Sequence, residues 1–374
     1  MRADHKRPGL LYAGTEFGMY VSYDGGGNWH PFQLNLPITP ITDLTIKNND
    51  LVVATQGRSL WILDDLSMVQ QLDPAFINKN MHVYQMNDAY RIPGVSSRWG
   101  APSVPANSAM NPPKGAVVNY WVKTVTDSTN ASITIVSPTG KVIKKFATGS
   151  KENPLTLKRG FNQFVWDLKY PEAEKADGLI LWNGTPSGIT AAPGKYTAHI
   201  QIGGDSTSVT FNLLADPNYK CTQADYEAQV SFLLQVQDKF NETMKAIKKI
   251  KSTREQLTGY TTRLGKTCPA ALKNLGDSLS KRLTAIEELL HQTKAKSGQD
   301  VLNYPIRLDD KLSGVFDMAN SGNMAPPKQA LDVFSGLATQ VDAALAQLQV
   351  VLGEGLQAFN KMIVELRLPV IVAE

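Results

Sequence analysis

No run of about 18 consecutive apolar residues occurs in the sequence, so it predicts no helix that spans a membrane. The first residues, from Met1 to Pro8, contain no apolar stretch of the kind found in secretory leaders, so no signal peptide is predicted in this chain. Charge is also sparse. Charged residues make up 19% of the chain and its net charge is +4, which is too little to indicate a nucleic-acid partner.

Residue patterns typical of metal and cofactor sites are missing as well. The five histidines and two cysteines do not fall into any ligand spacing of a zinc site. The sequence contains no phosphate-binding loop, no dinucleotide fingerprint and no G-x-S-x-G motif. We therefore expect no metal and no cofactor, and the motifs leave open whether the chain is an enzyme.

The 374 residues are unevenly composed, and their length suggests two or three domains. All six tryptophans lie before residue 183, and both cysteines, Cys221 and Cys268, lie after residue 220. This division indicates a β-rich first part joined to a helical second part.

Two regions of the first part are predicted to form short strands between Gly-, Asn- and Asp-rich turns. Residues 81–215 should hold about seven strands, which is typical of a sandwich of immunoglobulin type. Between Pro93 and Pro113 we expect an extended loop, because this stretch contains five prolines and no strand pattern. The expected strands are 10–14, 19–23, 29–32, 41–46, 51–55 and 59–63, followed by 82–86, 117–123, 132–137, 142–147, 162–168, 194–202 and 208–213.

From Thr222 onward the apolar period changes from two to about 3.6, which predicts an antiparallel helical bundle. Thr222 and Asp225 form an expected capping box. Further helices are predicted from Pro269, over Leu308–Ala319, and from Pro326–Pro327 to Pro369. Because the first long helix separates Cys221 from Cys268 by roughly 50 Å, no disulfide is expected between them. The basic residues from Lys245 to Arg254 are interpreted as a solvated helix face.

A tight turn between two expected strands carries a recognisable motif. Residues 22–29 match the Asp-box pattern S-x-D-x-G-x-x-W, whose fixed positions are Ser22, Asp24, Gly26 and Trp29. We expect Asp24 to accept hydrogen bonds from backbone N–H groups of the turn, and glycine to permit positive φ. Trp29 is expected to pack under the turn, so the motif is interpreted as structural.

The stretch from Leu51 to Asp65 resembles the final blade of a large bacterial family of β-propeller proteins, known as BNR-repeat, sortilin-type or glycosyl hydrolase-like proteins. The resemblance continues through Gly160–Leu168 and Ala192–Thr197, which in that family belong to an immunoglobulin-like domain, and through Asn303–Leu308. It covers nearly the whole chain. It implies an exported protein, periplasmic or secreted.

The resemblance also implies an incomplete propeller. Family members carry many blades before this point, whereas the strands here suffice for roughly one and a half, and open strand edges seek partners. We expect this chain to be the C-terminal part of a longer protein, or to use blades supplied by a second chain. The expected domains are terminal propeller blades at 1–75, an immunoglobulin-like β-sandwich at 76–216 and a helical bundle at 217–374.

Three functions follow from the resemblance. The first is a non-catalytic scaffold and interaction region that completes a propeller with blades from the same precursor or a second chain. The second is part of a glycoside hydrolase acting on complex polysaccharide, with its catalytic residues outside this chain. The third is a sortilin-like propeller that binds a peptide or protein. The ligand is accordingly expected to be carbohydrate or peptide.

Few residues qualify as ligand-facing or catalytic. Arg58, in a turn between strands, is a candidate for the ligand-facing side of the propeller together with Asp64 and Asp65; the alternative is that Arg58 pairs with one of these aspartates. Glycosidases need two carboxylates about 5–10 Å apart. The other acids of this segment are Glu16 and Asp43, and the sequence does not pair any two across a cleft.

Overall fold

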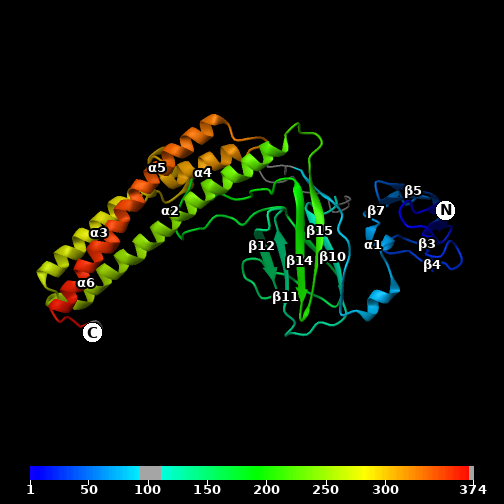
Figure 1. Ribbon diagram of the computed structural model, residues 1–374, viewed down its shortest axis with the longest axis horizontal. Helices are drawn as coiled ribbons and strands as arrows, with labels where there is room; N and C mark the ends of the chain where they lie inside the picture. Colours follow the sequence, from blue (N-terminus) through cyan, green and yellow to red (C-terminus); the bar gives the residue numbers. More distant parts are fainter. Residues whose placement is uncertain (93–110, 370–374) are drawn as a thin grey trace. The chain divides into compact units, whose positions relative to one another are not determined.

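The computed structural model describes residues 1–92 and 111–369 (Figure 1). These residues form two compact units, one built from strands and one mainly from helices. The first unit contains residues 1–91, 111–168 and 194–214, and the second contains Lys169–Pro193 together with the chain from Ala215 onward. The expected order of β structure followed by α structure is confirmed. Most of the loop expected between Pro93 and Pro113 lies outside the described residues.

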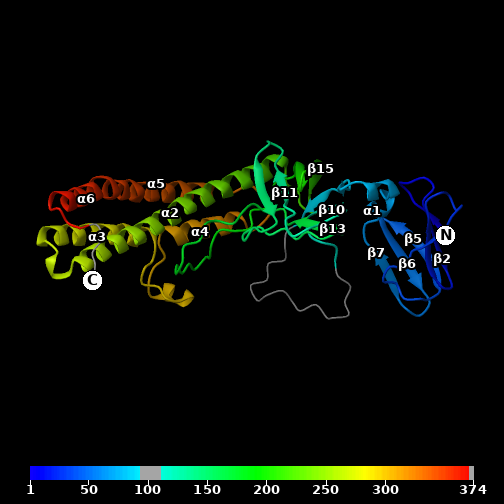
Figure 2. The same cartoon turned by 90° about the horizontal axis from the view of Figure 1, so that it is seen from below.

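Residues 2–63 form two small antiparallel sheets, which we call the paired sheets (Figure 2). Their inward-facing side chains share one apolar core, which includes Tyr12, Val21, Leu44 and Val53. Gly14 allows the close approach of the sheets, because a Cβ at this position would lie 2.4 Å from Cγ2 of Ile41. The first sheet has the order β1 (Arg2–Ala3), β2 (Leu11–Thr15), β3 (Gly18–Ser22) and β4 (His30–Pro31); the second has the order β5 (Ile41–Lys47), β6 (Asp50–Thr55) and β7 (Leu60–Leu63).

The second β region contains two further sheets. Aromatic side chains connect them: the ring of Trp166, which is fully buried, lies 5.5 Å from that of Tyr196 and 6.2 Å from that of Phe211. One sheet has the order β13 (Gly160–Trp166), β10 (Ala116–Val122) and β8 (Met81–Val83). The other has the order β12 (Val142–Ala147), β11 (Ala131–Val136), β14 (Gly194–Ile202), β15 (Asp205–Ala215) and β9 (Ala89–Arg91).

Between β7 and β8 the chain forms α1 (Ser67–Gln70) and the 3₁₀ turn η1 (Pro74–Asn78). Phe76 of η1 is 5% exposed, and its ring lies on a row of rings from three neighbouring strands. The row exists because Trp121 faces His82 on one side and Phe161 on the other. The ring centroids of these three residues lie 5.4–5.8 Å from that of Phe76, so this side chain anchors η1 to the sheet.

The helices of the second unit pack along one another around an apolar core (Figures 1 and 2). The expected capping box is confirmed: the Thr222 side chain accepts from the backbone N–H of Asp225, whose carboxylate accepts from Thr222 N–H. Both cysteines are free, as expected. None of the described helices is long and apolar enough to cross a membrane. The helices are α2 (Gln223–Leu264), α3 (Ala270–Leu290), α4 (Leu308–Ala319), α5 (Lys328–Val350) and α6 (Leu356–Glu365), with 3₁₀ turns at Gly265–Thr267 and Gly298–Leu302.

The last predicted helix differs from the structure in one respect. A π-helical turn, Val351–Gly355, interrupts it between α5 and α6. Gly353 and Gly355 weaken regular helix here, and a Cβ at position 355 would lie 2.6 Å from Cδ2 of Leu279 on α3. The apolar period continues across this turn, which explains why periodicity alone predicts one helix.

The segment Lys169–Pro193, which we call the strap, leaves the second β region after β13 and rejoins it at β14, yet packs with the helices. Its residues Ala173 and Ile189 are buried in the helical core. Asp310 of α4 accepts hydrogen bonds from the backbone N–H groups of Trp182 (2.7 Å) and Asn183 (2.9 Å). The expected domain boundaries place the strap with the sandwich, whereas its apolar side chains and amides find their partners on the helices.

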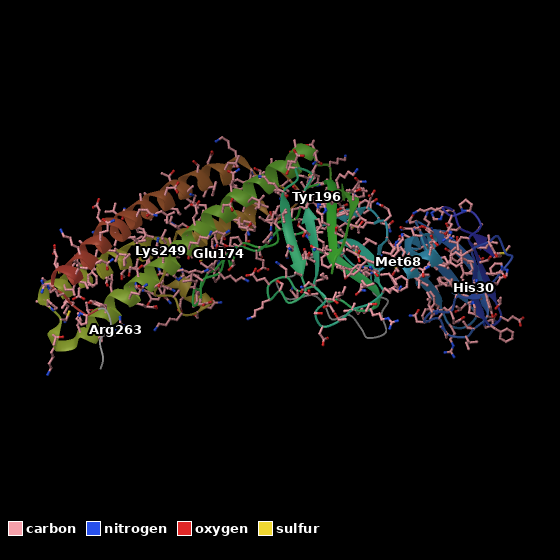
Figure 3. The ribbon with its side chains drawn as sticks, turned by 60° about the horizontal axis from the view of Figure 1, so that its bottom comes forward. His30, Met68, Glu174, Tyr196, Lys249 and Arg263 are labelled. Carbon is pink, nitrogen blue, oxygen red and sulfur yellow. The ribbon has the colours of Figure 1, made fainter. Side chains whose placement is uncertain are left out.

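The strap also pairs with the basic face of α2. Glu174, labelled in Figure 3, forms ion pairs with Lys245 (3.2 Å) and Lys248 (3.3 Å). Lys251 donates to the carbonyl oxygen of Asp177 at 3.4 Å. The lysines interpreted from sequence as a solvated face therefore have an acidic segment of the same chain beside them.

Candidate functional site

The Asp-box turn joins β3 to β4 through hydrogen bonds of two side chains. Asp24 accepts from the backbone N–H and the side-chain amide of Asn28, at 2.9 and 2.7 Å. The Ser22 hydroxyl donates to Asp24 at 2.8 Å and accepts from the N–H of Gly26 at 2.9 Å. Gly26 has a φ of 101°, and a Cβ there would come within 3.7 Å of the Trp29 ring. This chemistry fixes a turn, and every polar group named here is occupied by it.

The hydrogen bonds that Asp24 accepts from Asn28 and Ser22 hold the pKa of its carboxyl well below the usual range. A lowered folded pKa gives a stabilisation that is present above the unfolded pKa of about 4 and is lost as the pH falls towards the folded value. We expect Asp24→Asn to lower the thermal midpoint at neutral pH, and the difference from wild type to shrink below about pH 4. Asp205→Asn, at the exposed start of β15, is the matched control; a pH-independent effect of Asp24→Asn would contradict the expectation.

The face of the second paired sheet that points away from the shared core is apolar. Leu60 and Ile62 of β7 are 68% and 60% exposed. The register sets Leu60 opposite Ala54 and Ile62 opposite Val52, so the four side chains form one patch across β6 and β7. Strand β7 has apolar residues at all four positions, which is typical of a strand covered on both faces. This pattern in the sequence is the signal for the patch, which sequence reasoning missed.

The outer edge of β7 is unpaired. The N–H of Thr55 on β6 donates to the carbonyl oxygen of Ser59 at 3.3 Å. In an antiparallel ladder, residues that hydrogen-bond to the neighbouring strand alternate with residues that do not. Ser59, Trp61 and Leu63 therefore direct their backbone groups towards β6. Leu60 and Ile62 therefore direct theirs away from it. Among residues 1–92 and 111–369, no strand pairs with this edge. The first sheet, by contrast, has four strands, and its last strand, β4, pairs with β3.

The candidate ligand-facing residues are not brought together. Arg58 lies in the turn before β7, whereas Asp64 and Asp65 follow its other end. The four residues of the strand, about 13 Å at the rise of an extended chain, separate them. Neither aspartate is paired with Arg58 in the part of the chain that the structure describes. Asp65 instead accepts from the backbone N–H of Ser67 at 3.0 Å, at the start of α1, and from Asn49 at 3.1 Å.

The remaining acids of the paired sheets have structural partners or stand apart. Asp43 pairs with Arg2 at 2.9 Å on the surface. Burial, together with the charges of Asp50 and Asp65, raises the pKa of Asp64. In the part of the chain that the structure describes, no group of three His, Cys, Asp or Glu side chains is arranged to hold a metal ion.

The chain matches no known family model, no curated protein and no solved structure. The resemblance to Asp-box propeller proteins therefore rests on the residues quoted above for it. The geometry adds an apolar patch and an unpaired strand edge on the same strand, β7, and these two features make up the candidate site.

Proposed function

We propose that this chain is a non-catalytic scaffold and interaction region, in which the paired sheets are neighbouring blades of an Asp-box β-propeller. Blades from the same precursor or from a second chain would complete it. The observation that carries the proposal is β7, whose exposed side chains and unpaired edge lie on one strand. A binding site for a small soluble ligand would need neither exposed apolar side chains nor an unpaired strand edge.

Both outer faces of the paired sheets support a blade-like arrangement. The second sheet presents the patch of Val52, Ala54, Leu60 and Ile62. On the first sheet, Ala13 and Tyr20 face each other across β2 and β3 on the side opposite the core residues, and both are half-buried. In a propeller each blade packs its two faces on its neighbours, so apolar residues on both outer faces are what an internal pair of blades requires.

The edge of β7 supports a specific completion. A fourth strand added there would hydrogen-bond to the N–H and C=O groups of Leu60 and Ile62 and give the second sheet the four strands of the first. Exposed edges of this kind are otherwise blunted by charge or proline. None of the four residues of β7 is charged or proline.

The other parts of the chain follow the same proposal. The second β region would be the immunoglobulin-like sandwich of that architecture, and the helical unit would be its terminal bundle. The location would be outside the cytoplasm, periplasmic or secreted. These assignments rest on the sequence resemblance, on the two sheets joined through Trp166 and on the order of β and α units.

A photo-crosslinking amino acid at position 62, in the chain expressed in its native source, tests the proposal. We expect a cross-linked peptide that contains or borders a strand followed by an S-x-D-x-G-x-x-W turn, identified by mass spectrometry. Introducing Leu60→Lys should abolish the cross-link, because a charge cannot be covered by a neighbouring blade. The matched control is the same amino acid at Val364, which is apolar and 74% exposed but lies in the helical unit.

Other outcomes separate the alternatives. A monomeric chain in which position 62 stays accessible to hydroxyl-radical labelling would refute blade completion. A cross-link to a short peptide ligand would favour the sortilin-like function instead. A carboxylate pair contributed jointly with the cross-linked segment, together with hydrolysis of polysaccharide, would favour the glycoside hydrolase.

A further inference from the structure

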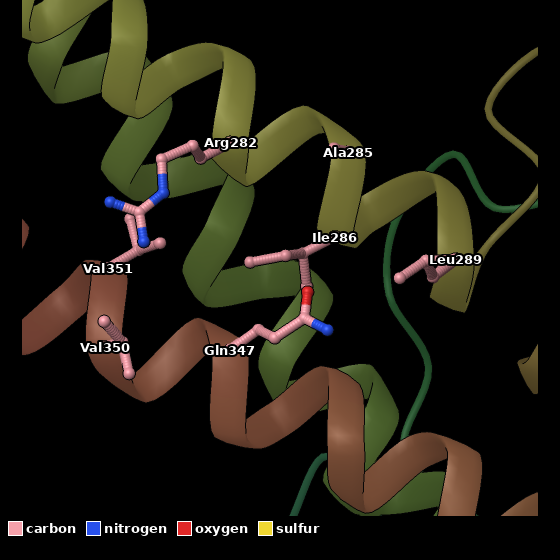
Figure 4. Close-up of a pocket in the computed structure, with 7 residues that line it drawn as sticks. All are labelled: Arg282, Ala285, Ile286, Leu289, Gln347, Val350 and Val351. Atoms are coloured by element: carbon pink, nitrogen blue, oxygen red, sulfur yellow. The ribbon is translucent and has the colours of Figure 1, made fainter.

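The helical unit has a groove that is separate from the Asp-box turn, the apolar patch and the unpaired edge of the paired sheets. It runs between α3 and α5 and has a volume of about 280 Å³ (Figure 4). Its lining comes from one face of each helix, at positions i, i+3, i+4 and i+7 of α3 and at i, i+3 and i+4 of the α5 end. The lining residues are Arg282, Ala285, Ile286, Leu289, Gln347, Val350 and Val351.

The groove has an apolar floor and apolar walls. Ile286 and Val351 are buried, and they form the part of the lining closest to the helical core. Leu289 and Val350 are each 46% exposed, which leaves large apolar side chains in contact with water. Ala285 provides the space, because a longer side chain at this position of α3 would occupy the groove.

Two polar side chains reach across this apolar surface. In Figure 4, Arg282 extends from α3 towards Val351, and Gln347 extends from the other helix towards Ile286. Arg282 has no carboxylate three or four residues away on its helix, where Ser278, Leu279, Ala285 and Ile286 stand. Among the described residues no acid lies within ion-pair distance of its guanidinium. The groove thus has a positive charge with no negative charge beside it.

The backbone at the groove is also irregular. Val351 is the first residue of the π-helical turn Val351–Gly355, and such turns occur frequently at functional sites. The site therefore combines a concave apolar lining, one unpaired cation, one free amide and a non-standard helical turn, which together are the ordinary ingredients of a small-ligand site.

We propose that this groove binds a small monocarboxylate with an unbranched apolar chain. The guanidinium of Arg282 donates two hydrogen bonds to the carboxylate in a bidentate pair, and the Gln347 amide donates a further one. The apolar chain lies on Ile286, Leu289 and Val350. A volume just below the usual range for ligand pockets of about 300–1,000 Å³ favours a short chain over a long-chain lipid. The site is independent of the function proposed for the paired sheets.

Titration of the whole chain with hexanoate, octanoate and decanoate, followed by calorimetry and amide chemical shifts, tests this proposal. Octanoate should bind with a 1:1 stoichiometry, and affinity should rise by roughly fourfold per fully buried methylene until the groove is filled. Arg282→Gln should weaken octanoate binding by about tenfold or more, since a charged hydrogen bond is lost. Ala285→Leu should abolish binding by filling the space, and its exposed position keeps the fold intact.

Lys281→Gln is the matched control, because Lys281 is the neighbouring cation, is exposed and does not line the groove. It should leave octanoate binding unchanged. Octylammonium, which has the same chain and the opposite charge, should not bind. Non-saturable association, equal binding of octylammonium, or octanoate binding that survives both Arg282→Gln and Ala285→Leu would overturn the proposal.

Discussion

Replacement of Asp310 by alanine is expected to destabilise the helical unit by about 3 kcal/mol. The Asp310 side chain is 3% exposed and accepts from the N–H groups of Trp182 and Asn183 and from the Asn183 amide. Alanine leaves two backbone donors of the strap unpaired, at about 1–3 kcal/mol each. Urea denaturation measures the loss, and faster amide exchange at Trp182 and Asn183 locates it.

Two further variants make this expectation specific to the strap. Asp310→Asn keeps one side-chain oxygen and should cost roughly half as much. Asp332→Ala removes an exposed carboxylate that pairs with Lys328 on α5 and should change stability by less than about 0.5 kcal/mol. If Asp310→Ala were no more destabilising than Asp332→Ala, the carboxylate would not be what holds the strap.

Phe76→Ala should destabilise the β unit by about 3–5 kcal/mol, because it removes a buried ring and leaves a cavity among four others. The centroid of the Phe76 ring lies 6.1 Å from that of Tyr84, and the other three rings are those of His82, Trp121 and Phe161. If the η1 turn detaches before the sheets unfold, the lost stability appears first as faster hydrogen exchange of the backbone amides from Ala75 to Lys79.

The neighbouring residue supplies the control for this prediction. Ile77 belongs to the same turn and is 55% exposed, so Ile77→Ala should change the free energy of unfolding by about 0.5 kcal/mol or less. Equal effects of the two substitutions in urea denaturation would show that the aromatic row does not anchor the turn.

Local patterns allowed most elements to be predicted from the sequence. The apolar residues that follow Thr222 at helical spacing, such as Tyr226, Leu233, Phe240 and Ile247, are all buried in α2. Strands β12 and β14 have the predicted bounds. Periodicity succeeds at these places because each side chain is buried by the regular geometry of its own element.

The strap and the buried polar pairs were not predictable in this way. Arg254 pairs with Glu287 at 2.5 Å, and His291 lies 2.6 Å from Asp309, whose pKa is raised by burial. Glu287 and Asp309 occupy positions on the apolar faces of α3 and α4, but their charge favours an assignment to solvent. Their partners come from distant parts of the chain, so only tertiary packing reveals that these side chains are inside.

Part of the candidate site could be predicted from the sequence. The Asp-box turn is local, and its hydrogen bonds link residues that are two to four positions apart. The patch on β6 and β7 has a signal in the sequence, the four consecutive apolar residues of β7, but packing decides which face the shared core leaves uncovered. Arg58 and Asp64 show the opposite case, since nearness in sequence placed them at opposite ends of one strand.

The position of the strap in the chain also sets an order for biosynthesis. Its contacts with Asp310 and Ser313 span 127 to 130 residues, so the ribosome completes the strap long before α4. At about 5–20 residues per second this interval lasts roughly 6 to 25 seconds. Until α2 has been made, Ile189 and Ala173 have no helices to cover them, and α4 joins them later. The sheets on either side can form first and hold both ends of the strap, so the helices would then fold onto a segment that is already tethered.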